Sequence, residues 1–444
     1  MNLRPYQTRS VSDLSATLMR SRRVILRLDV GAGKTVTIAE AIRRCVARGR
    51  RVLFLVDRRE LLEQASRKLT EAGVAHGLIY RDSDRTEHAV QVASKDTLIR
   101  RAPMTDVDLL VIDECHIAAQ TTIQRLIERH NPRWIAGLTA TPARMDGKPL
   151  PFDEIIEPVS YAELVRDGYL CDPVVYGPDV PDLDGVHTQA GDYRTDELLP
   201  IVSKLTGNIV QTFQRLGSYP AVGFAVDVQH ARELAAECCA AGIDAISVDG
   251  SCSDSERAAA LRHPGLVWSV GLFLQGTDRP EWCCAVVARP TRSFTVHRQM
   301  LGRVQRPKPR AVILDHAGNC LRLGLPSERI AWSLKGRPAR PKPEPMRVCP
   351  KCYRVNVGGS KACGECGTVF PIVPRARPKL ERGELKLATP QRKEAVYRAL
   401  VAKGERLGYK PGWSAAVYRG MFGEWPSDSL TTRRADPAAH RLAQ

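Results

Sequence analysis

The chain has 444 residues, of which 43% are hydrophobic and 26% charged, and its formal net charge is +17. This length is enough for two or three domains, and the composition is typical of a soluble globular protein. No apolar run is long enough to span a bilayer and no apolar signal region follows the N-terminus, so we expect a cytoplasmic protein without a membrane partner.

The positive charge is concentrated in the C-terminal quarter. Residues 335–444 contain 23 Lys/Arg and 9 Asp/Glu, a net charge of +14, which leaves about +3 for the rest of the chain. A basic tail on a nearly balanced body favours a polyanionic partner, most commonly nucleic acid. The alternative is a solvated basic tail that binds nothing specific.

Residues 1–170 alternate short apolar runs with amphipathic stretches. The runs predicted as buried strands are 24–28, 51–56, 89–93, 109–112 and 134–138. Helical spacing is found at 35–47 and 60–69. Strands that alternate with helices predict an α/β domain, in which helices cover both faces of a parallel sheet.

A second α/β domain is predicted after a connector at 171–200, which is rich in Pro, Asp and Gly. This domain spans 201–334. Its predicted strands are 221–226, 245–248, 266–270, 285–288 and 311–314, and its predicted helices are 228–241 and 294–304. The fold class is therefore α/β, with two tandem parallel-sheet domains.

The C-terminal region is divided by two basic linkers, 335–346 and 371–390, around a cysteine cluster at 347–370. The segment 391–426 interleaves aromatic residues with cations, which could stack bases and neutralise phosphates. We favour a small helical domain with an aromatic core, because Tyr397 and Leu400 fit one helical face. Residues 427–444 are predicted to be a disordered tail.

A glycine-rich loop follows the first predicted strand and opens a predicted helix. Its residues are Gly31, Ala32, Gly33, Lys34 and Thr35. Glycines let backbone N–H groups turn towards phosphate oxygens, while Lys34 would reach the β- and γ-phosphates and Thr35 would coordinate Mg²⁺. Leu28 stands where the strict phosphate-loop pattern has glycine, so this loop by itself could also be a chance match.

Two adjacent acids follow the buried run 109–112 and strengthen this interpretation. Acids at the carboxyl end of a parallel strand face the region where open α/β sheets bind ligands. Asp113 would hold Mg²⁺, directly or through water, and Glu114 would polarise the attacking water. Together with the glycine-rich loop they predict an ATP-hydrolysing site; the alternative is a pair of acids that caps a strand.

Four of the 13 cysteines form two C-x-x-C pairs, Cys349/Cys352 and Cys363/Cys366. Four thiolates at this spacing can close a tetrahedral Zn²⁺ site, and an iron site or a disulfide pair is the alternative. A site filled by four protein ligands is structural. Nearby cations, Lys351, Arg354 and Lys361, could touch phosphates, or the ribbon could only fold a small module or bind protein. The other nine cysteines suit reduced thiols.

These residues together resemble superfamily-2 helicases of the DEAD/DEAH type, and most of all the RadD-like and phage-encoded DNA repair helicases with a C-terminal zinc finger. The resemblance implies two RecA-like domains and adds site residues in the first. Gln7 would contact the adenine, His116, Thr139 and Thr141 would couple hydrolysis to movement, and the nucleic-acid track would contain Arg58, Arg59, Ser94 and Thr97.

In the second predicted domain, Gly276 and Asp278 resemble motif V, which adds to the nucleotide site. Residues 299–306 resemble motif VI, with Gln299 as a coupling residue. Arg303 and Arg306 would be arginine fingers that reach across the cleft to the γ-phosphate, so hydrolysis would depend on domain closure.

The sequence departs from the family pattern at several positions. Asp29 and Val30 replace Pro-Thr before the loop, and a carboxylate near a triphosphate is electrostatically unhelpful. Lys95-Asp96 replaces Val-Gln, Gln275 replaces Glu, and the stretch 263–268 is shortened. These departures bear on hydrolysis and on the grip on the strand.

The sequence thus predicts an ATP-dependent helicase or translocase that uses ATP, Mg²⁺ and Zn²⁺ and acts on single-stranded or forked DNA, in repair or replication. One alternative is an RNA helicase. The other is a non-catalytic DNA-binding scaffold with a decayed ATPase.

Overall fold

The computed structural model describes residues 2–57, 59–81, 83, 86–102, 104, 106–117, 120–144, 146–177, 180–274, 276–335, 346–371, 389–406 and 408–427. Residues 1–371 form one compact unit and residues 372–444 a second unit. Both α/β domains and the cysteine cluster lie in the first unit.

The first domain is a seven-stranded parallel sheet in the order β3-β4-β2-β5-β6-β1-β7. Its strands are β1 (Arg23–Arg27), β2 (Val52–Val56), β3 (Gly77–Ile79), β4 (Val90–Ser94), β5 (Leu109–Ile112), β6 (Trp134–Thr139) and β7 (Glu154–Ile156). Every residue of β2, β4 and β5 is buried, because helices cover both faces of the sheet; these strands are apolar except for Gln91 and Ser94 of β4.

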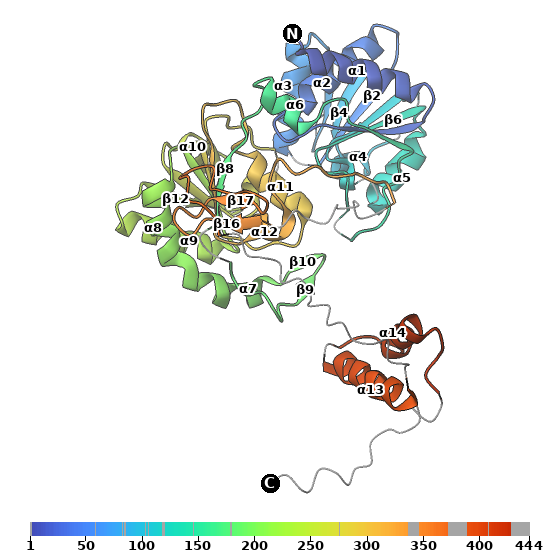
Figure 1. Ribbon diagram of the computed structural model, residues 1–444. Coiled ribbons are helices and arrows are strands. Elements are labelled where there is room, and N and C mark those ends of the chain that lie inside the picture. Colours follow the sequence, from blue (N-terminus) through green and yellow to red (C-terminus); the bar gives the residue numbers. More distant parts are fainter. Residues whose placement is uncertain are drawn as a thin grey trace. The chain divides into compact units, whose positions relative to one another are not determined.

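One face of this sheet is covered by α1 (Pro5–Leu18), α2 (Lys34–Val46) and α3 (Arg59–Glu71), and the other by α4 (Lys95–Leu98) and α5 (Thr121–His130) (Figure 1). The short helix α6 (Tyr161–Arg166) precedes the second domain. Because all strands are parallel, their carboxyl ends meet at one edge, and the loops after β1, β5 and β6 lie side by side there.

The second domain is a six-stranded parallel sheet in the order β12-β13-β11-β14-β15-β8. Its strands are β8 (Val174–Tyr176), β11 (Ala221–Phe224), β12 (Ala245–Val248), β13 (Leu266–Ser269), β14 (Cys284–Val287) and β15 (Val312–Asp315). Its helices are α7 (Thr195–Val202), α8 (Thr206–Leu216), α9 (Val228–Ala240), α10 (Asp254–Arg262), α11 (Phe294–Gly302) and α12 (Asn319–Leu323). The predicted α/β class with two parallel sheets is confirmed.

The connector predicted at 171–200 contains regular structure. It holds the edge strand β8, a small hairpin of β9 (Thr188–Gln189) and β10 (Asp192–Tyr193), and most of α7. The hairpin is tied to the second domain because Asp192 accepts hydrogen bonds from the Thr291 hydroxyl at 2.7 Å and the Arg292 N–H at 2.8 Å. The strands in this segment have only two or three residues, which is too short for a clear alternating pattern.

The cysteine cluster packs on the second domain through β16 (Met346–Val348) and β17 (Val355–Val357). Val355 lies in the core of that domain, and Arg354 forms an antiparallel bridge with Tyr176 of β8. Arg310 and Glu365 add an ion pair of 2.8 Å. The module therefore covers the free edge of the sheet.

The second unit contains α13 (Pro390–Arg406) and α14 (Trp413–Phe422). Tyr397 and Tyr418 are buried and pack edge-on with ring centroids 5.5 Å apart, as expected for an aromatic core. The linkers at 336–345 and 372–388 and the tail at 428–444 lie outside the described residues.

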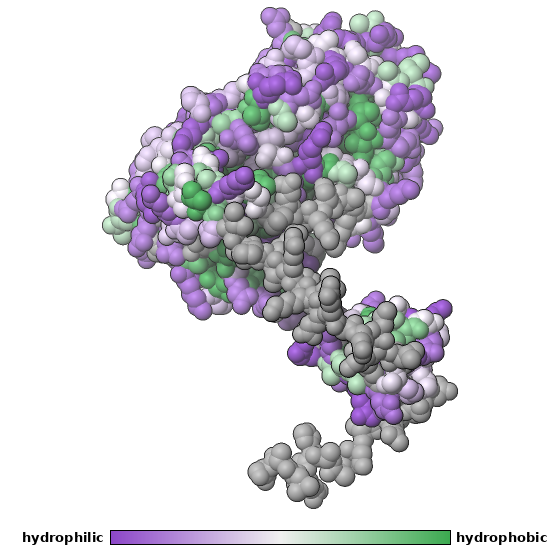
Figure 2. Space-filling view, viewed as in Figure 1, coloured by the Kyte–Doolittle hydropathy of each residue, from purple (hydrophilic) through white to green (hydrophobic). Residues whose placement is uncertain are grey.

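Hydrophilic side chains dominate the face of both units seen in Figure 2, and hydrophobic ones form small separate groups. Among the described helices, none is long and apolar enough to cross a membrane.

Candidate active site

The loop after β1 has the backbone geometry of a phosphate cradle. Gly31 and Gly33 have φ of 91° and 76°, values that side chains disfavour, and α2 begins directly at Lys34. The Ala32 N–H donates to the Asp29 carbonyl at 3.0 Å, which closes the turn. Lys34 is half-buried, and desolvation lowers the pKa of its ammonium while Glu114 and Asp113 raise it. The loop therefore presents N–H groups and one cation to a common point.

Both glycines also allow close approach by distant side chains. A Cβ at Gly31 would lie 2.1 Å from Nη1 of Arg306, and one at Gly33 would lie 2.7 Å from Nε2 of Gln7. Gln7 is buried and its side-chain oxygen accepts the N–H of Arg4 at 2.9 Å. The structure thus brings the predicted adenine-contacting residue and a predicted arginine finger against the same loop.

Asp113 and Glu114 lie at the end of β5, close to Lys34. Burial, followed by the charge of Glu114, raises the pKa of Asp113 to about 7. Burial also opposes ionisation of Glu114, but His116 and Lys34 outweigh it and its pKa lies at about 2. His116 Nδ1 is 3.5 Å from Oε2 of Glu114. Glu114 is therefore the ionised member of the pair, and Asp113 would ionise fully when a cation binds.

The loop after β6 contacts the same carboxylate. The Thr139 hydroxyl donates to Glu114 at 3.4 Å and accepts the Thr141 N–H at 3.1 Å. Both threonines are buried. These contacts connect the loop after β6 to Glu114, the residue expected to polarise water.

The two predicted arginine fingers differ in their surroundings. Arg303 donates to the carbonyls of Thr277 at 2.5 Å, Leu274 at 3.1 Å and Gln299 at 3.2 Å. Burial and the neighbouring Arg306 lower the Arg303 pKa to about 10. Arg306 forms an ion pair of 2.8 Å with Asp278, while its Nη1 is buried beside the loop without a hydrogen bond. Arg306 is thus aimed at the phosphate position, whereas Arg303 is held by its own domain.

A cavity of about 150 Å³ separates the two walls. It is lined by residues that include Gly33, Lys34, Thr35, Asp113, Glu114, Gly276, Asp278, Arg303 and Arg306. Ligand pockets for molecules of nucleotide size are usually at least about 300 Å³. The two domains therefore lie close together at this position.

Arg27 compensates the charge of Asp29, one of the departures that precede the loop. Both oxygens of Asp29 are bonded by Arg27, at 2.5 and 2.8 Å, and both side chains are less than a tenth exposed. Asp29 is therefore paired with Arg27 and is not a free carboxylate beside the loop. Gln275 lies outside the described residues.

The predicted nucleic-acid track is partly assembled. The Ser94 hydroxyl accepts the N–H of Thr97 at 3.4 Å and begins α4, and Asp96 is exposed in the first turn of that helix. Arg59 is paired with Asp254 of the second domain at 2.7 Å. Lys95 is paired with Asp57. Arg58 lies outside the described residues.

The four clustered cysteines converge as a metal site requires. Their sulfur atoms all lie within 4.8 Å of one another, with Cys349–Cys366 at 3.6 Å and Cys352–Cys363 at 3.5 Å. A tetrahedron with Zn–S bonds of about 2.3 Å has edges of roughly 3.8 Å, so the set fits Zn²⁺. The Asn356 amide donates to Cys363 at 3.7 Å, and hydrogen bonds from Thr368 lower the pKa of Cys366 to about 6.

Residues 1–144 match the family described as "Type III restriction enzyme, res subunit". A "51.5 kDa protein" of a Lactococcus phage is 26% identical over 410 residues, which cover 88% of this chain and 87% of that protein. "Putative ATP-dependent helicase IRC3" of Saccharomyces cerevisiae is 27% identical over 354 residues, which cover 71% of this chain and 51% of that protein.

Among solved structures, the "ATP-dependent Type ISP restriction-modification enzyme LlaBIII bound to DNA" is similar with a TM-score of 0.54 and 15% identity, covering 70% of this chain and 27% of that one. This likeness concerns the fold. The two parallel sheets, the loop, the paired acids and the sequence matches together indicate an ATPase that is similar to ATP-dependent helicases and to subunits of restriction enzymes.

Sequence reasoning assigned no role to Arg27 or Tyr6. The Tyr6 hydroxyl donates to the Ala32 carbonyl at 2.8 Å and fixes α1 on the loop. A buried tyrosine or arginine carries no local signal of its partner, because the partner lies far away in the sequence.

Proposed function

We propose that the chain is an ATP-dependent DNA translocase or helicase, in which ATP and Mg²⁺ bind between the two domains. The observation that carries this proposal is the approach of Arg306, from the second domain, to Gly31 of the loop in the first. A cation presented from one domain to a phosphate held by the other makes hydrolysis depend on closure, and closure moves the two halves of a bound strand.

In this proposal each site residue has one task. Lys34 and the loop hold the phosphates, Thr35 and Asp113 hold Mg²⁺, and Glu114 activates water. Gln7 reads the adenine, and the residues lining the other wall of the cleft, Gly276, Asp278, Arg303 and Arg306, complete the nucleotide site. Mg²⁺ would supply charge neutralisation at the phosphates when bound.

DNA is favoured over RNA by the restriction-enzyme family match and by the described binding of DNA by LlaBIII. The net charge of +14 after residue 335 supports a polyanionic partner. A role in repair, a likeness to the RadD-like helicases, a bound Zn²⁺ and a cytoplasmic location belong to the same proposal. Of the four departures that motivate the decayed-scaffold alternative, one, Asp29, is paired with Arg27.

The test is steady-state ATP hydrolysis without nucleic acid and with single-stranded DNA, forked DNA or RNA, beside Glu114→Gln. We expect stimulation by DNA, and a loss of about 10²–10⁴-fold in turnover in Glu114→Gln with ATP binding retained. Stimulation by RNA alone would favour the RNA helicase. No hydrolysis under any condition, or full activity in Glu114→Gln, would contradict the proposal.

A further inference from the structure

After α12 the chain returns from the second domain to the first along residues Pro326–Leu334, here called the strap. Its far end is fixed to the first domain, where the Leu150 N–H donates to the Leu334 carbonyl at 3.0 Å and Leu334 packs on the core. Its near end is held by Arg298 of α11, which donates to the carbonyls of Pro326 and, at 3.0 Å, Glu328. The strap therefore contacts both domains.

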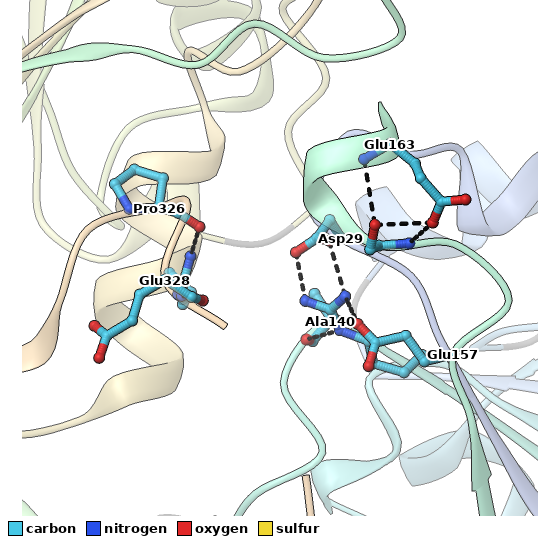
Figure 3. A network of polar contacts seen from close by, with 9 residues as sticks. Asp29, Ala140, Glu157, Glu163, Pro326 and Glu328 are labelled. Carbon is cyan, nitrogen blue, oxygen red and sulfur yellow. Dashed lines mark hydrogen bonds and ion pairs between the residues drawn. The ribbon is translucent and has the colours of Figure 1, made fainter. Parts of the chain in front are cut away.

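Trp332 of the strap contacts residues of both domains. Its ring packs edge-on against Phe294 of α11, with centroids 5.8 Å apart. On the opposite side, the Arg27 guanidinium lies 5.6 Å from the ring centroid. A cavity of about 410 Å³ lies beside these contacts and is lined by both domains and the strap. In Figure 3, Pro326 and Glu328 stand on one side of this space and Asp29 and Glu157 on the other.

Arg27 connects three separate loops of the first domain. It bonds both oxygens of Asp29 before the phosphate loop, the Glu157 carboxylate after β7 at 2.6 Å, and the Ala140 carbonyl after β6 at 3.2 Å. A planar guanidinium with several donors suits a site with three acceptors. Only 8% of the Arg27 side chain is exposed, so these contacts are shielded from solvent.

Two of these acceptors adjoin the residues expected to act on ATP. Asp29 accepts the Ala32 N–H through its own carbonyl and so forms the first turn of the loop. Ala140 stands between Thr139, whose hydroxyl bonds Glu114, and Thr141. A shift of the Arg27 head group would therefore move both the phosphate loop and the segment that holds Glu114.

We propose that Arg27 is a positioning residue for ATP hydrolysis, and that the strap, through Trp332, makes its geometry depend on contact with the second domain. The inference rests on the ATPase activity and is independent of which nucleic acid the chain uses. It also assigns a role to the Asp29 carboxylate, because this carboxylate forms an ion pair with Arg27. The plainer interpretation is a buried ion pair that only stabilises the fold, and the experiment must separate the two.

The experiment compares kcat and KM for ATP in the full chain, without nucleic acid and with DNA, for Arg27→Gln, Arg27→Lys, Trp332→Ala and Trp332→Phe. We expect Arg27→Gln to lower kcat about tenfold or more while KM changes less than about threefold, because displacement of reacting groups acts on the chemical step. Arg27→Lys should restore little of the lost kcat, because one ammonium group cannot make the several hydrogen bonds of the planar guanidinium. Trp332→Ala should resemble Arg27→Gln, and Trp332→Phe should retain most of the activity.

The matched control is Arg194→Gln. Arg194 also bonds a carboxylate two residues on, Asp196, but at the surface of the second domain. It should leave kcat unchanged. Wild-type kcat in Arg27→Gln, or a lowered melting temperature with unchanged kcat in the folded variant, would overturn the proposal in favour of the stabilising ion pair.

A second measurement does not depend on turnover. The contribution of Trp332 to the fluorescence is the emission of the wild type minus that of Trp332→Phe. This contribution should change when a non-hydrolysable ATP analogue and Mg²⁺ are added. The change should be lost in the Arg27→Gln background. No nucleotide-dependent difference would overturn the role of the strap. If the wild type hydrolyses no ATP at all, the proposed function fails, while the emission still decides whether the strap responds to nucleotide.

Discussion

Val30 of the phosphate loop lies directly against Gly302 at the end of α11: a Cβ placed on Gly302 would be 2.5 Å from the Cβ of Val30. This contact joins the two domains next to the nucleotide site. Val30 is one of the departures from the helicase pattern, and its side chain fills the space that glycine leaves open. The departure therefore belongs to the domain contact, and Val30 also lines the nucleotide cavity.

We expect Gly302→Ala to keep the domains apart by a few tenths of an ångström or more and to lower kcat for ATP by about tenfold, since closure brings Arg306 to the phosphate. ATP binding to the first domain should be little affected. Steady-state kinetics and binding of a fluorescent ATP analogue measure the two effects. Gly359→Ala is the control, because a Cβ there meets nothing within 4 Å. Equal kcat in both variants would contradict a closed catalytic state.

A second contact between the domains occupies a residue of the predicted nucleic-acid track. Arg59 pairs with Asp254 at 2.7 Å, and both side chains are largely exposed. Arg59 also forms an ion pair of 2.8 Å with Glu63 of its own helix. Asp254→Asn should remove the partner from the second domain, raise the affinity for single-stranded DNA about two- to fivefold and steepen its salt dependence by about 0.7 in log–log slope.

Fluorescence anisotropy at several salt concentrations measures both quantities. Asp244→Asn makes the same change of charge at an exposed residue that pairs with His263, and it controls for net charge. If both variants gain affinity equally, the pair has no specific role in keeping Arg59 from DNA.

The sequence predicted the sheets and the convergence of Lys34 with Asp113 because parallel strands place their loops at one edge, whatever the details of packing. It could not predict that Arg27 neutralises Asp29, since side-chain direction at the end of β1 depends on Glu157 and Ala140, more than 100 residues away. The two arginines of motif VI were also equivalent in sequence. They differ only because Arg303 meets carbonyls of its own domain while Arg306 extends towards Gly31.

The cysteine module offers a test of metal content and stability together. We expect one Zn²⁺ per chain, lost in Cys352→Ser/Cys363→Ser or on chelation. Because Val355 belongs to the core of the second domain, the melting temperature should fall by at least about 3 °C. Elemental analysis and differential scanning calorimetry measure these changes, and Cys239→Ser, at an exposed cysteine outside the cluster, is the control. Iron in place of zinc, or an unchanged melting temperature after metal loss, would contradict this assignment.

The raised pKa of Asp113 predicts a pH-dependent affinity for Mg²⁺. Burial and the neighbouring Glu114 place this pKa at about 7, above the usual 3.8, so below pH 7 the metal must displace a proton. The Mg²⁺ concentration that half-saturates ATP hydrolysis should therefore be about tenfold higher at pH 6 than at pH 8.

The stability of the metal-free chain should fall as pH rises, whereas its affinity for Mg²⁺ should rise. The folded state retains a proton that the unfolded state releases between about pH 4 and pH 7, so the contribution of Asp113 to the free energy of unfolding declines as pH rises through this window and is lost above about pH 7. Asp113→Asn should flatten the stability profile. Asp315→Asn, at another carboxyl whose pKa burial raises, should leave the Mg²⁺ profile intact. A half-saturating Mg²⁺ concentration independent of pH in the wild type would show that Asp113 is not the proton that the metal displaces.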